Sequence, residues 1–392
     1  MKILFIATQV EMINSSAAIR NCTLINGLHE LGHEVHVHTI EYPAVYTSTY
    51  LKDNLQAANV VRTQLPIYKF NQSVESQGIL KRASLLREFL KKVRSFVFFP
   101  DMSITWLKSY DYSKLDSDYD LMISSSDSKV SHLLAEKVQK KLGIKWVQVW
   151  GDPWFDDFTM SKFTQLRAKR HESRLLSKAD NVVYVSKATH SKQQSLFVKN
   201  AEKMNYVPRG FMKTVETENT IKDNQIRISY TGNLFWGRNV SSLIEALKKF
   251  NETSEVKFVL DIYGVKDEKF LEMSREYEFI NIYAPVDYAQ ILQVYEKSNI
   301  LLFISNSSTS TQIPGKFFDY SGTTRPMLCL MNDDECQIAR YLKSFDRCLV
   351  IKNDEAVISE NMSRMMEMAS HTYEIPASFY PKEVATQIID KL

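Results

Sequence analysis

Lys316 and Asp319 are the residues whose types and spacing point most directly to chemistry. They lie in the stretch STQIPGKFFDYSGTTRPMLCL, residues 310–330, where Pro314 suits the first turn of a helix. Lys316 would then fall in the same turn, where a cation opposes the helix dipole at a cost of about 0.3–1 kcal/mol that a bound anion would remove. Asp319 follows about one turn later and could accept hydrogen bonds from the two vicinal hydroxyls of a ribose. The alternative is a weak surface ion pair at i,i+3, against which the Pro314–Gly315 pair argues.

A second cation, Arg238, lies in the stretch YTGNLFWGRNVSSLIEAL, residues 230–247. An apolar strand is expected to end at Thr231, and Gly232 would let the main chain approach a ligand closely. A helix is expected to begin near Asn239, so Arg238 would stand just before its N-terminus. Oriented amides and a guanidinium together suit a phosphate. The alternative is a solvated arginine on an ordinary turn between a strand and a helix.

Strands and helices alternate along almost the whole chain, which predicts parallel sheets covered by helices on both faces. The polar stretch KTVETENTIKDNQ at 213–225 interrupts the alternation, which then restarts. The fold class predicted is therefore α/β, with two Rossmann-like domains whose parallel sheets face each other across a cleft. The expected strands are 2–8, 34–39, 121–124, 146–150, 182–185, 227–231, 256–263, 300–304, 327–331 and 348–351, and the expected helices include 240–250, 288–297 and 355–369.

The length of 392 residues also favours two domains. We expect an N-terminal, acceptor-side domain at 1–207 and a C-terminal, donor-binding domain at 208–375, with a last helix at 376–392 packing back on the first domain. In sheets of this kind, ligands bind outside the carboxyl ends of the strands.

Charge and cysteine usage exclude several classes of function. The formal net charge is only +3, which argues against a general nucleic-acid binder. The four cysteines form no CxxC pair and the eight histidines show no ligand spacing, so no metal site is expected. The N-terminus, MKILFIATQVEM, is interpreted as a first strand and not as a signal peptide, and no apolar run approaches the ~20 residues of a spanning helix. These features predict a cytoplasmic protein.

The stretch around Arg238 resembles the donor-binding half of glycosyltransferase family 4, the large retaining GT-B family. The first donor loop of that family reads roughly G-R-L-x4-K-G before its helix. Gly232 and Leu234 match this pattern, and Arg238 stands where the family has Lys. Asn233 stands in place of the Arg, so one of the two cations that grip the phosphates is missing. The resemblance implies that this loop binds the donor.

The stretch around Lys316 resembles the Glu-x7-Glu segment of the same family. Asp319 stands at the second Glu, which in the family holds the donor ribose, and Thr311 at the first, which contacts the donor sugar. Further similarities follow in the family's order: LHELGHEVHVHT at 28–39, ADNVVYVS at 179–186 and VPRGF at 207–211, where Arg209 stands in place of the Asn of the family's PNG hinge. The resemblance therefore covers nearly the whole chain.

The first loop of the chain is less regular than its family counterpart. Family members often carry a Gly-Gly pair here, whereas this chain has Ser15, Ser16 and two alanines, whose small size would still let a backbone approach the donor. Arg20 follows in the first turns of the expected helix. Ser15, Ser16 and Arg20 are candidates for the acceptor and sugar side, and the alternative is an ordinary capped helix.

The segment WGDPW at 150–154 follows an apolar strand. Trp150 and Trp154 beside a carboxylate suggest a platform for a sugar ring, and Asp152 is the candidate catalytic residue. The family often has His-Asp near this point, and Gly151 replaces that His. The alternative is a structural Asp152 that caps the following turn.

Residues 79–98 form a basic amphipathic stretch that ends in an aromatic run. Its cations suit an anionic membrane surface, and the alternative is a solvated helix whose apolar face packs on its own domain. The PD-x4-W pattern that follows, Pro100, Asp101 and Trp106, also recurs in bacterial members of the family. We therefore expect a protein that can lie on the inner face of a membrane.

The resemblance implies a retaining, metal-independent transfer of a sugar from a nucleotide-diphosphate sugar to a saccharide or lipid-linked acceptor, in the synthesis of a cell-surface polysaccharide or glycoconjugate. Arg238 and Lys316 would hold the diphosphate, Asp319 the ribose, and Asp152 would lie near the reacting sugar; no cofactor is expected. Two alternatives remain open: a catalytically silent nucleotide-sugar-binding protein and a GT-B nucleotide-sugar epimerase.

Overall fold

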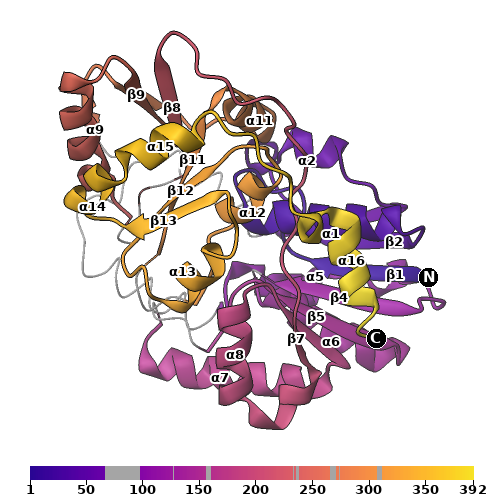
Figure 1. Ribbon diagram of the computed structural model, residues 1–392. Helices are drawn as coiled ribbons and strands as arrows, with labels where there is room; N and C mark the ends of the chain where they lie inside the picture. The colour runs from indigo at the N-terminus through magenta and orange to yellow at the C-terminus, as the bar shows by residue number, and fades with distance from the viewer. Residues whose placement is uncertain are drawn as a thin grey trace, which may run out of the picture. The chain divides into compact units, whose positions relative to one another are not determined.

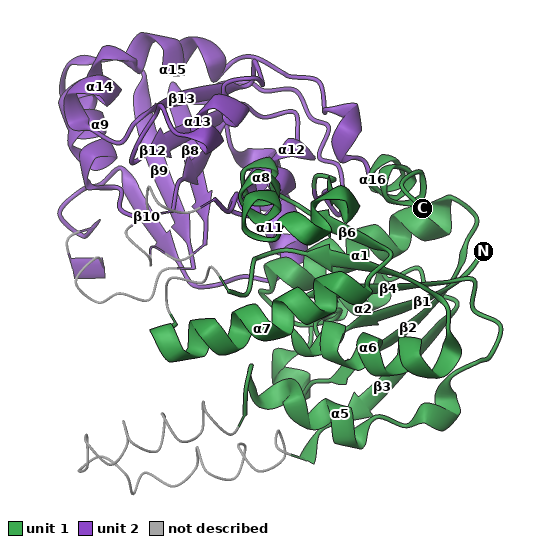
Figure 2. Cartoon of the chain, turned by 90° about the horizontal axis from the view of Figure 1, so that it is seen from below, with its two compact units in different colours: residues 1–208, 381–392 green, residues 209–380 purple. Residues whose placement is uncertain are grey.

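A computed structural model of the chain describes residues 1–66, 98–126, 128–155, 160–232, 234, 238–264, 271–272, 274–306 and 311–392. These residues form two compact units: unit 1 comprises Met1–Pro208 and Pro381–Leu392, and unit 2 comprises Arg209–Tyr380 (Figures 1 and 2). Each unit contains a parallel sheet with helices packed against it, as the alternating pattern predicts.

The sheet of unit 1 is parallel throughout and has the order β3-β2-β1-β4-β5-β6-β7. Strands β2 and β3 lie on one side of β1, and strands β4 to β7 lie on its other side. The strand order therefore reverses between β1 and β4. The strands are β1 Lys2–Ala7, β2 Glu34–Glu41, β3 Asn59–Gln64, β4 Leu121–Ser126, β5 Lys145–Trp150, β6 Asn181–Tyr184 and β7 Met204–Tyr206.

Serine caps begin several helices of unit 1, because a hydroxyl can accept from a main-chain N–H of the first turn. The C-terminal helix packs closely on α1: a Cβ added at Gly27 would collide with the main-chain carbonyl of Pro381. Val384 and Ile388 join the same buried cluster as Leu24. The helices are α1 Ser16–Glu30, α2 Thr49–Asp53, α5 Trp106–Ser109, α6 Val130–Leu142, α7 Lys162–Lys178, α8 Lys187–Leu196 and α16 Pro381–Ile389.

The sheet of unit 2 is also parallel, with the order β10-β9-β8-β11-β12-β13. Its strands are β8 Gln225–Thr231, β9 Lys257–Tyr263, β10 Ile280–Tyr283, β11 Ile300–Ile304, β12 Met327–Met331 and β13 Cys348–Lys352. The helices are α9 Ser241–Thr253, α11 Tyr288–Lys297, α12 Lys316–Ser321, α13 Gln337–Leu342, α14 Glu355–Glu360 and α15 Met362–Met368. Helices α9, α14 and α15 lie together over one face of the sheet, where they bury the larger apolar cluster of the unit (Figure 1).

Three edge strands, β3, β7 and β10, are absent from the strands predicted from the sequence, because edge strands are half-exposed and carry fewer apolar residues. The single helix expected at 355–369 is two helices, α14 and α15, separated at Asn361. Helix α12 is only six residues long. Within the described part of the chain, no helix combines the length and apolar character that a membrane span requires.

Candidate functional site

The strand order of unit 2 reverses between β8 and β11, and such a switch point is where open α/β sheets bind ligands. Gly232 follows β8 directly and adopts φ 153°, while Gly264 follows β9 with φ 103°. A Cβ at Gly264 would lie 3.3 Å from the carbonyl oxygen of Gly232, so the two strand ends approach each other closely. The Gly232 amide donates to the carbonyl of Tyr263 at 2.8 Å, which fixes this turn.

Arg238 connects the ends of the two strands that flank the switch point. Its Nη2 donates to Oδ1 of Asn306, which follows β11, at 2.6 Å, and its Nη1 lies 3.5 Å from the hydroxyl of Tyr230 on β8. The main-chain carbonyl of Asn306 in turn accepts from the Asn332 side chain at 2.9 Å. Arg238 therefore lies at the carboxyl edge of the sheet, where the sequence predicted a phosphate-binding cation.

Helix α12 contributes a second cation beside a buried ion pair. Arg209 donates from Nη2 to Oδ1 of Asp319 at 2.6 Å, and both side chains are only 3% exposed. Nζ of Lys316 lies 4.0 Å from Oδ2 of the same carboxylate and is partly exposed. Asp319 thus has one oxygen held by Arg209 and the other oriented toward Lys316.

The electrostatics of this group favour an anion. Burial lowers the pKa of Lys316, and the positive charges of Arg209 and Arg238 lower it further, while Asp319 acts in the opposite direction. Lys316 is therefore affected by both guanidinium groups as well as by the carboxylate, and within these four residues positive charge is in excess. An anionic ligand would relieve the mutual repulsion of the cations. We call Arg209, Arg238, Lys316 and Asp319 the anion group.

Buried tyrosines hold α12 against the end of β8. The hydroxyl of Tyr320 accepts from the amide of Thr231 at 3.4 Å and lies 3.2 Å from the Thr231 hydroxyl. Tyr295 of α11 packs edge-on against Tyr320 with ring centroids 5.3 Å apart. Because these contacts fix α12 relative to β8, they also fix Lys316 relative to the loop that carries Arg238. The helix has only six residues, so its dipole is small and the case for a bound anion depends on the cations.

The remaining donor-side candidates lie before α12 or in the loop after β8. Thr311, Pro314 and Gly315 are partly exposed and directly precede α12, and their contacts with a donor stay predictions. Asn233 lies outside the described residues. The sequence does not indicate the role of Arg209, which stands in place of the Asn of the hinge motif. Its buried pair with Asp319 joins residues that are far apart in the chain.

In unit 1, Arg20 lies at the corresponding switch point between β1 and β4. Its buried guanidinium donates to the main-chain carbonyl of Ser126 and lies 3.3 Å from the hydroxyl of Ser125, both at the end of β4. Ser15 caps α1 by accepting from the amide of Ala18 at 3.1 Å, whereas Ser16 is exposed. The structure thus gives Ser15 and Arg20 structural partners, and their part in acceptor binding stays a prediction.

Asp152 is partly exposed and lies just beyond the end of β5. Its main-chain carbonyl accepts from Nζ of Lys129 at 2.6 Å. The same ammonium group lies 5.3 Å from the centre of the Trp150 ring, and Lys129 as a whole is buried. Sequence reasoning does not single out Lys129, because a lysine directly before a helix usually lies in solvent. The catalytic role of Asp152 stays a prediction.

The expected sugar platform of Trp150 and Trp154 is wrong, because both rings are fully buried in the apolar cluster of unit 1. Trp154 stacks on Phe99 and on His171, with centroids 5.2 and 5.6 Å away. Trp150 packs on the buried His132 at 4.3 Å. Tryptophans beside an aspartate look alike in sequence whether they line a binding site or fill a core.

The basic stretch at 79–98 lies outside the described residues. Of the motif that follows it, Asp101 accepts from the hydroxyl of Ser128 at 2.7 Å, and Trp106 is fully buried, so both have structural partners. No group of three or more His, Cys, Asp or Glu residues that could hold a metal occurs in the ranges that the structure describes.

Comparison with known proteins shows the fold. No family model matches the chain, and neither does any curated protein. Sucrose-phosphate synthase from Thermosynechococcus elongatus has a similar structure over 100% of this chain and 98% of its own, with a TM-score of 0.63 and 11% identity. The lipopolysaccharide outer core galactosyltransferase WaaB, in its apo form, gives a TM-score of 0.54 and 17% identity over 100% of both chains. UDP-GlcNAc 2-epimerase from Neisseria meningitidis, bound to UDP-GlcNAc, gives 0.56 and 13% over 100% of this chain and 99% of its own.

Proposed function

We propose that this chain, which has the GT-B fold of two Rossmann-like domains, is a glycosyltransferase that uses a nucleotide-diphosphate sugar as donor. The observation that carries the proposal is the anion group at the carboxyl edge of unit 2, where Arg238 and Lys316 lie on either side of the switch point. Glycosyltransferases and a nucleotide-sugar epimerase share this fold, and the epimerase structure holds UDP-GlcNAc. This similarity supports a nucleotide sugar as the anionic ligand of this chain.

In this proposal, the anion group binds the donor through its diphosphate and ribose. Arg238 and Lys316 hold the diphosphate, and Gly232 lets the main chain approach it. Asp319 accepts from the ribose hydroxyls through Oδ2, the oxygen on the side of Lys316, while Arg209 keeps the carboxylate in place through Oδ1. Arg209 is therefore a positioning residue.

Transfer breaks the bond between the anomeric carbon of the sugar and the diphosphate oxygen, and forms a bond from that carbon to the oxygen of an acceptor hydroxyl, whose proton passes to the leaving diphosphate. Negative charge grows on the diphosphate as the bond breaks. Arg238 and Lys316 stabilise that charge, and a fixed electrostatic contribution of this kind is often the largest one in catalysis. In this proposal the reaction proceeds with retention and without a metal, and Asp152 is the catalytic residue on the acceptor side.

The acceptor is a saccharide or a lipid-linked saccharide, in the assembly of a cell-surface polysaccharide or glycoconjugate. The basic stretch at 79–98 supports a peripheral position on an anionic membrane, where lipid-linked acceptors are found. The similarity to a galactosyltransferase of the lipopolysaccharide outer core agrees with an acceptor of this class.

The second candidate function is epimerisation of a nucleotide sugar, which the similarity to UDP-GlcNAc 2-epimerase favours. Such an enzyme changes the donor sugar with no acceptor present. Incubation of the purified chain with single nucleotide sugars, followed by NMR of the products, separates the two functions. Release of free nucleotide diphosphate, increased by a saccharide acceptor, supports the transferase. A new sugar configuration that is still attached to nucleotide supports the epimerase, and no reaction at all supports a silent binding protein.

The experiment that tests donor binding is a thermal-shift panel of nucleoside diphosphates and nucleotide sugars. A ligand present at one hundred times its Kd stabilises the folded state by about 2.7 kcal/mol, which is readily measured. The proposal expects a shift with at least one nucleoside diphosphate and no comparable shift with the nucleoside alone. Absence of any shift across the panel would contradict it.

A further inference from the structure

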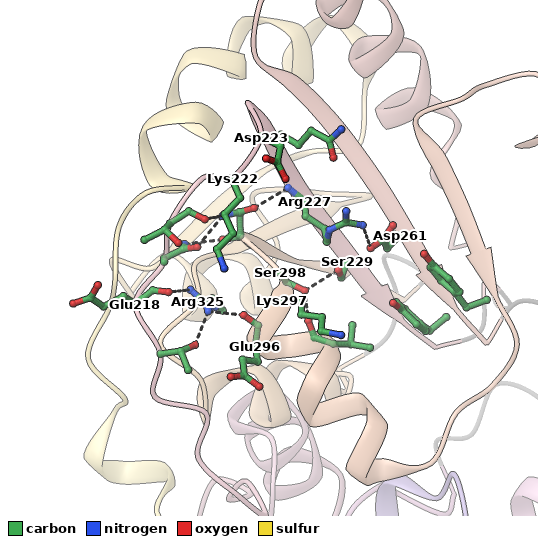
Figure 3. A pocket seen from close by; sticks show the side chains of 18 residues that line it. Glu218, Lys222, Asp223, Arg227, Ser229, Asp261, Glu296, Lys297, Ser298 and Arg325 are labelled. Atoms are coloured by element: carbon green, nitrogen blue, oxygen red, sulfur yellow. Dashed lines mark hydrogen bonds and ion pairs between the residues drawn. The ribbon is translucent and has the colours of Figure 1, made fainter.

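A trough of about 790 Å³ lies on the face of the unit 2 sheet that carries Ser229 and Asp261 (Figure 3). Strands β8 and β9 form its floor, and the end of α11 and the segment 217–225 form its walls. The volume is in the range that holds a small ligand. No residue of the anion group belongs to the described lining, so the trough is distinct from the proposed donor site.

The floor of the trough is polar because of the strand register. Ser229 on β8, Asp261 on β9 and Asn281 on β10 lie side by side, and register neighbours in parallel strands point to the same face. The intervening residues, such as Ile228 and Leu260, point to the other face, into the larger apolar cluster. The alternation of polar and apolar residues in β8 therefore leaves this face of the sheet without an apolar side chain from that strand.

Hydrogen bonds hold the polar groups of the floor in fixed positions. Arg227 donates from Nη1 to Oδ2 of the buried Asp261 at 2.5 Å, a contact that Figure 3 shows. Nδ2 of Asn281 donates to the other oxygen at 2.8 Å. Arg227 remains 32% exposed, and a guanidinium has five N–H donors, so further donors are available to a ligand. The site is thus preorganised for hydrogen bonding.

An aromatic platform lies at one end of this polar row. The rings of Tyr263 and Tyr283 stack with centroids 4.4 Å apart and an angle of 14° between their planes. Tyr283 is 39% exposed. A flat ring beside fixed donors and acceptors matches a sugar, which combines an apolar C–H face with hydroxyls around its edge.

The charge balance of the lining favours a neutral ligand. Four described lining residues are cationic and four are anionic: Lys222, Arg227, Lys297 and Arg325, and Glu218, Asp223, Asp261 and Glu296. The anion group contrasts with this balance, because three of its four members are cations. A nucleotide or a phosphate would gain little net attraction in the trough, whereas a neutral polyhydroxylated molecule could use donors and acceptors of both kinds.

We propose that the trough is a second saccharide site, which holds a neutral oligosaccharide with one ring stacked on Tyr283 and its hydroxyls bonded to Arg227. The inference rests on the proposed function in one respect, which is that the ligand of the trough is a saccharide. The carbonyls of Tyr263 and Tyr283 accept from Gly232 at 2.8 Å and from Gly264 at 3.0 Å, so the platform adjoins the strand ends at the donor site. A saccharide chain bound here is kept close to unit 2 between successive reactions.

The test is saturation-transfer NMR of the full chain with two neutral probes, a tetrasaccharide of glucose and a tetrasaccharide of N-acetylglucosamine. Binding of at least one probe is expected, and Tyr283→Ala should weaken it about tenfold, because a lost aromatic contact is worth about 1.4 kcal/mol. Tyr283→Phe keeps the ring and should keep most of the affinity. Tyr277→Ala is the matched control, since Tyr277 packs beside the apolar cluster on the other face of the sheet.

Outcomes for the two sites can be distinguished in the same experiment. The variant Lys316→Ala, in which Tyr283 is intact, should bind the oligosaccharide probe as wild type does. The variant Tyr283→Ala should show the same thermal shift with a nucleoside diphosphate as wild type. No binding of either probe, or equal binding by wild type and Tyr283→Ala, would overturn the trough proposal and leave the proposed function standing. If the wild-type protein binds a probe but shows no thermal shift with any nucleoside diphosphate, the proposed function is contradicted and the trough proposal stands.

Discussion

Arg209 and Asp319 are 110 residues apart in sequence and join through a 2.6 Å contact between two side chains that are each 3% exposed. The pair connects the start of unit 2 to the helix that carries Lys316. Two buried charges of opposite sign stabilise each other only as long as both are present, because either one alone would remain desolvated without a counterion.

Arg209→Ala should therefore destabilise unit 2 by about 3–5 kcal/mol, the usual cost of breaking a buried ion pair. Hydrogen exchange of unit 2 peptides is the suitable measurement, since two units need not unfold together. Replacing both partners with apolar residues, Arg209→Met with Asp319→Leu, should restore most of the loss. Lys249→Ala removes a pair that lies at the surface and serves as the control. Exchange in Arg209→Ala that matches wild type would show that the pair is not formed in solution.

The lowered pKa of Lys316 predicts how donor binding depends on pH. Burial and two neighbouring guanidinium groups bring this pKa below the ordinary value of 10.5. In the ligand-free protein, Lys316 therefore loses its proton earlier than a solvated lysine as pH rises, and the attraction for a diphosphate falls with it. Affinity for a nucleoside diphosphate, measured by calorimetry from neutral to alkaline pH, should decline before pH 10.5 is reached.

Lys316→Arg is the matched variant for this prediction, because a guanidinium stays charged over the whole range. Its affinity should remain flat where that of wild type declines. The same shift also affects stability: the unfolded chain binds more protons than the folded one in this interval, so the contribution of Lys316 to folding becomes less unfavourable as pH rises. A parallel decline in both proteins would assign the pH dependence to another group.

The sequence predicted the two sheets well because buried parallel strands are continuous apolar runs. The runs at Ile300–Ile304 and Met327–Met331 have the expected bounds, whereas the half-exposed β3 and β10 lacked such a signal. The positions of Arg238 and Lys316 beside the carboxyl edge of the unit 2 sheet could be predicted because each lies close in sequence to a recognisable helix start, and their binding of phosphate stays a prediction. The Arg209–Asp319 pair and the burial of Trp154 could not, because both depend on contacts between segments far apart in the chain.

Activity should persist in excess EDTA, because the proposal assigns the charge of the leaving group to Arg238 and Lys316 and not to a divalent ion. The measurement is release of nucleoside diphosphate in the presence of acceptor, with and without chelator. If transfer stops in EDTA and returns on addition of magnesium or manganese, the metal-independent mechanism is wrong.

The basic stretch at 79–98 predicts binding to vesicles rich in anionic lipid that weakens as salt increases, since each Lys or Arg near such a surface contributes about 1 kcal/mol. Replacing Arg87, Lys91, Lys92 and Arg94 with Gln should abolish binding and leave the circular dichroism spectrum unchanged. Vesicle flotation measures this directly. Equal recovery with neutral vesicles, or none with either kind, would favour a helix that packs on its own domain.

The central claim is that Arg238 and Lys316 hold a diphosphate, and the most direct measurement is nucleotide affinity together with transfer rate in Arg238→Ala and Lys316→Ala. Each loss of a charge-assisted hydrogen bond should cost about 1.5–3 kcal/mol, or roughly tenfold to a hundredfold. The effect should be larger on rate than on binding, because the leaving-group charge grows toward the transition state. Lys248→Ala and Lys257→Ala, exposed cations of the same unit, should stay near wild type. If Arg238→Ala and Lys316→Ala behave like these two controls, the donor site lies elsewhere.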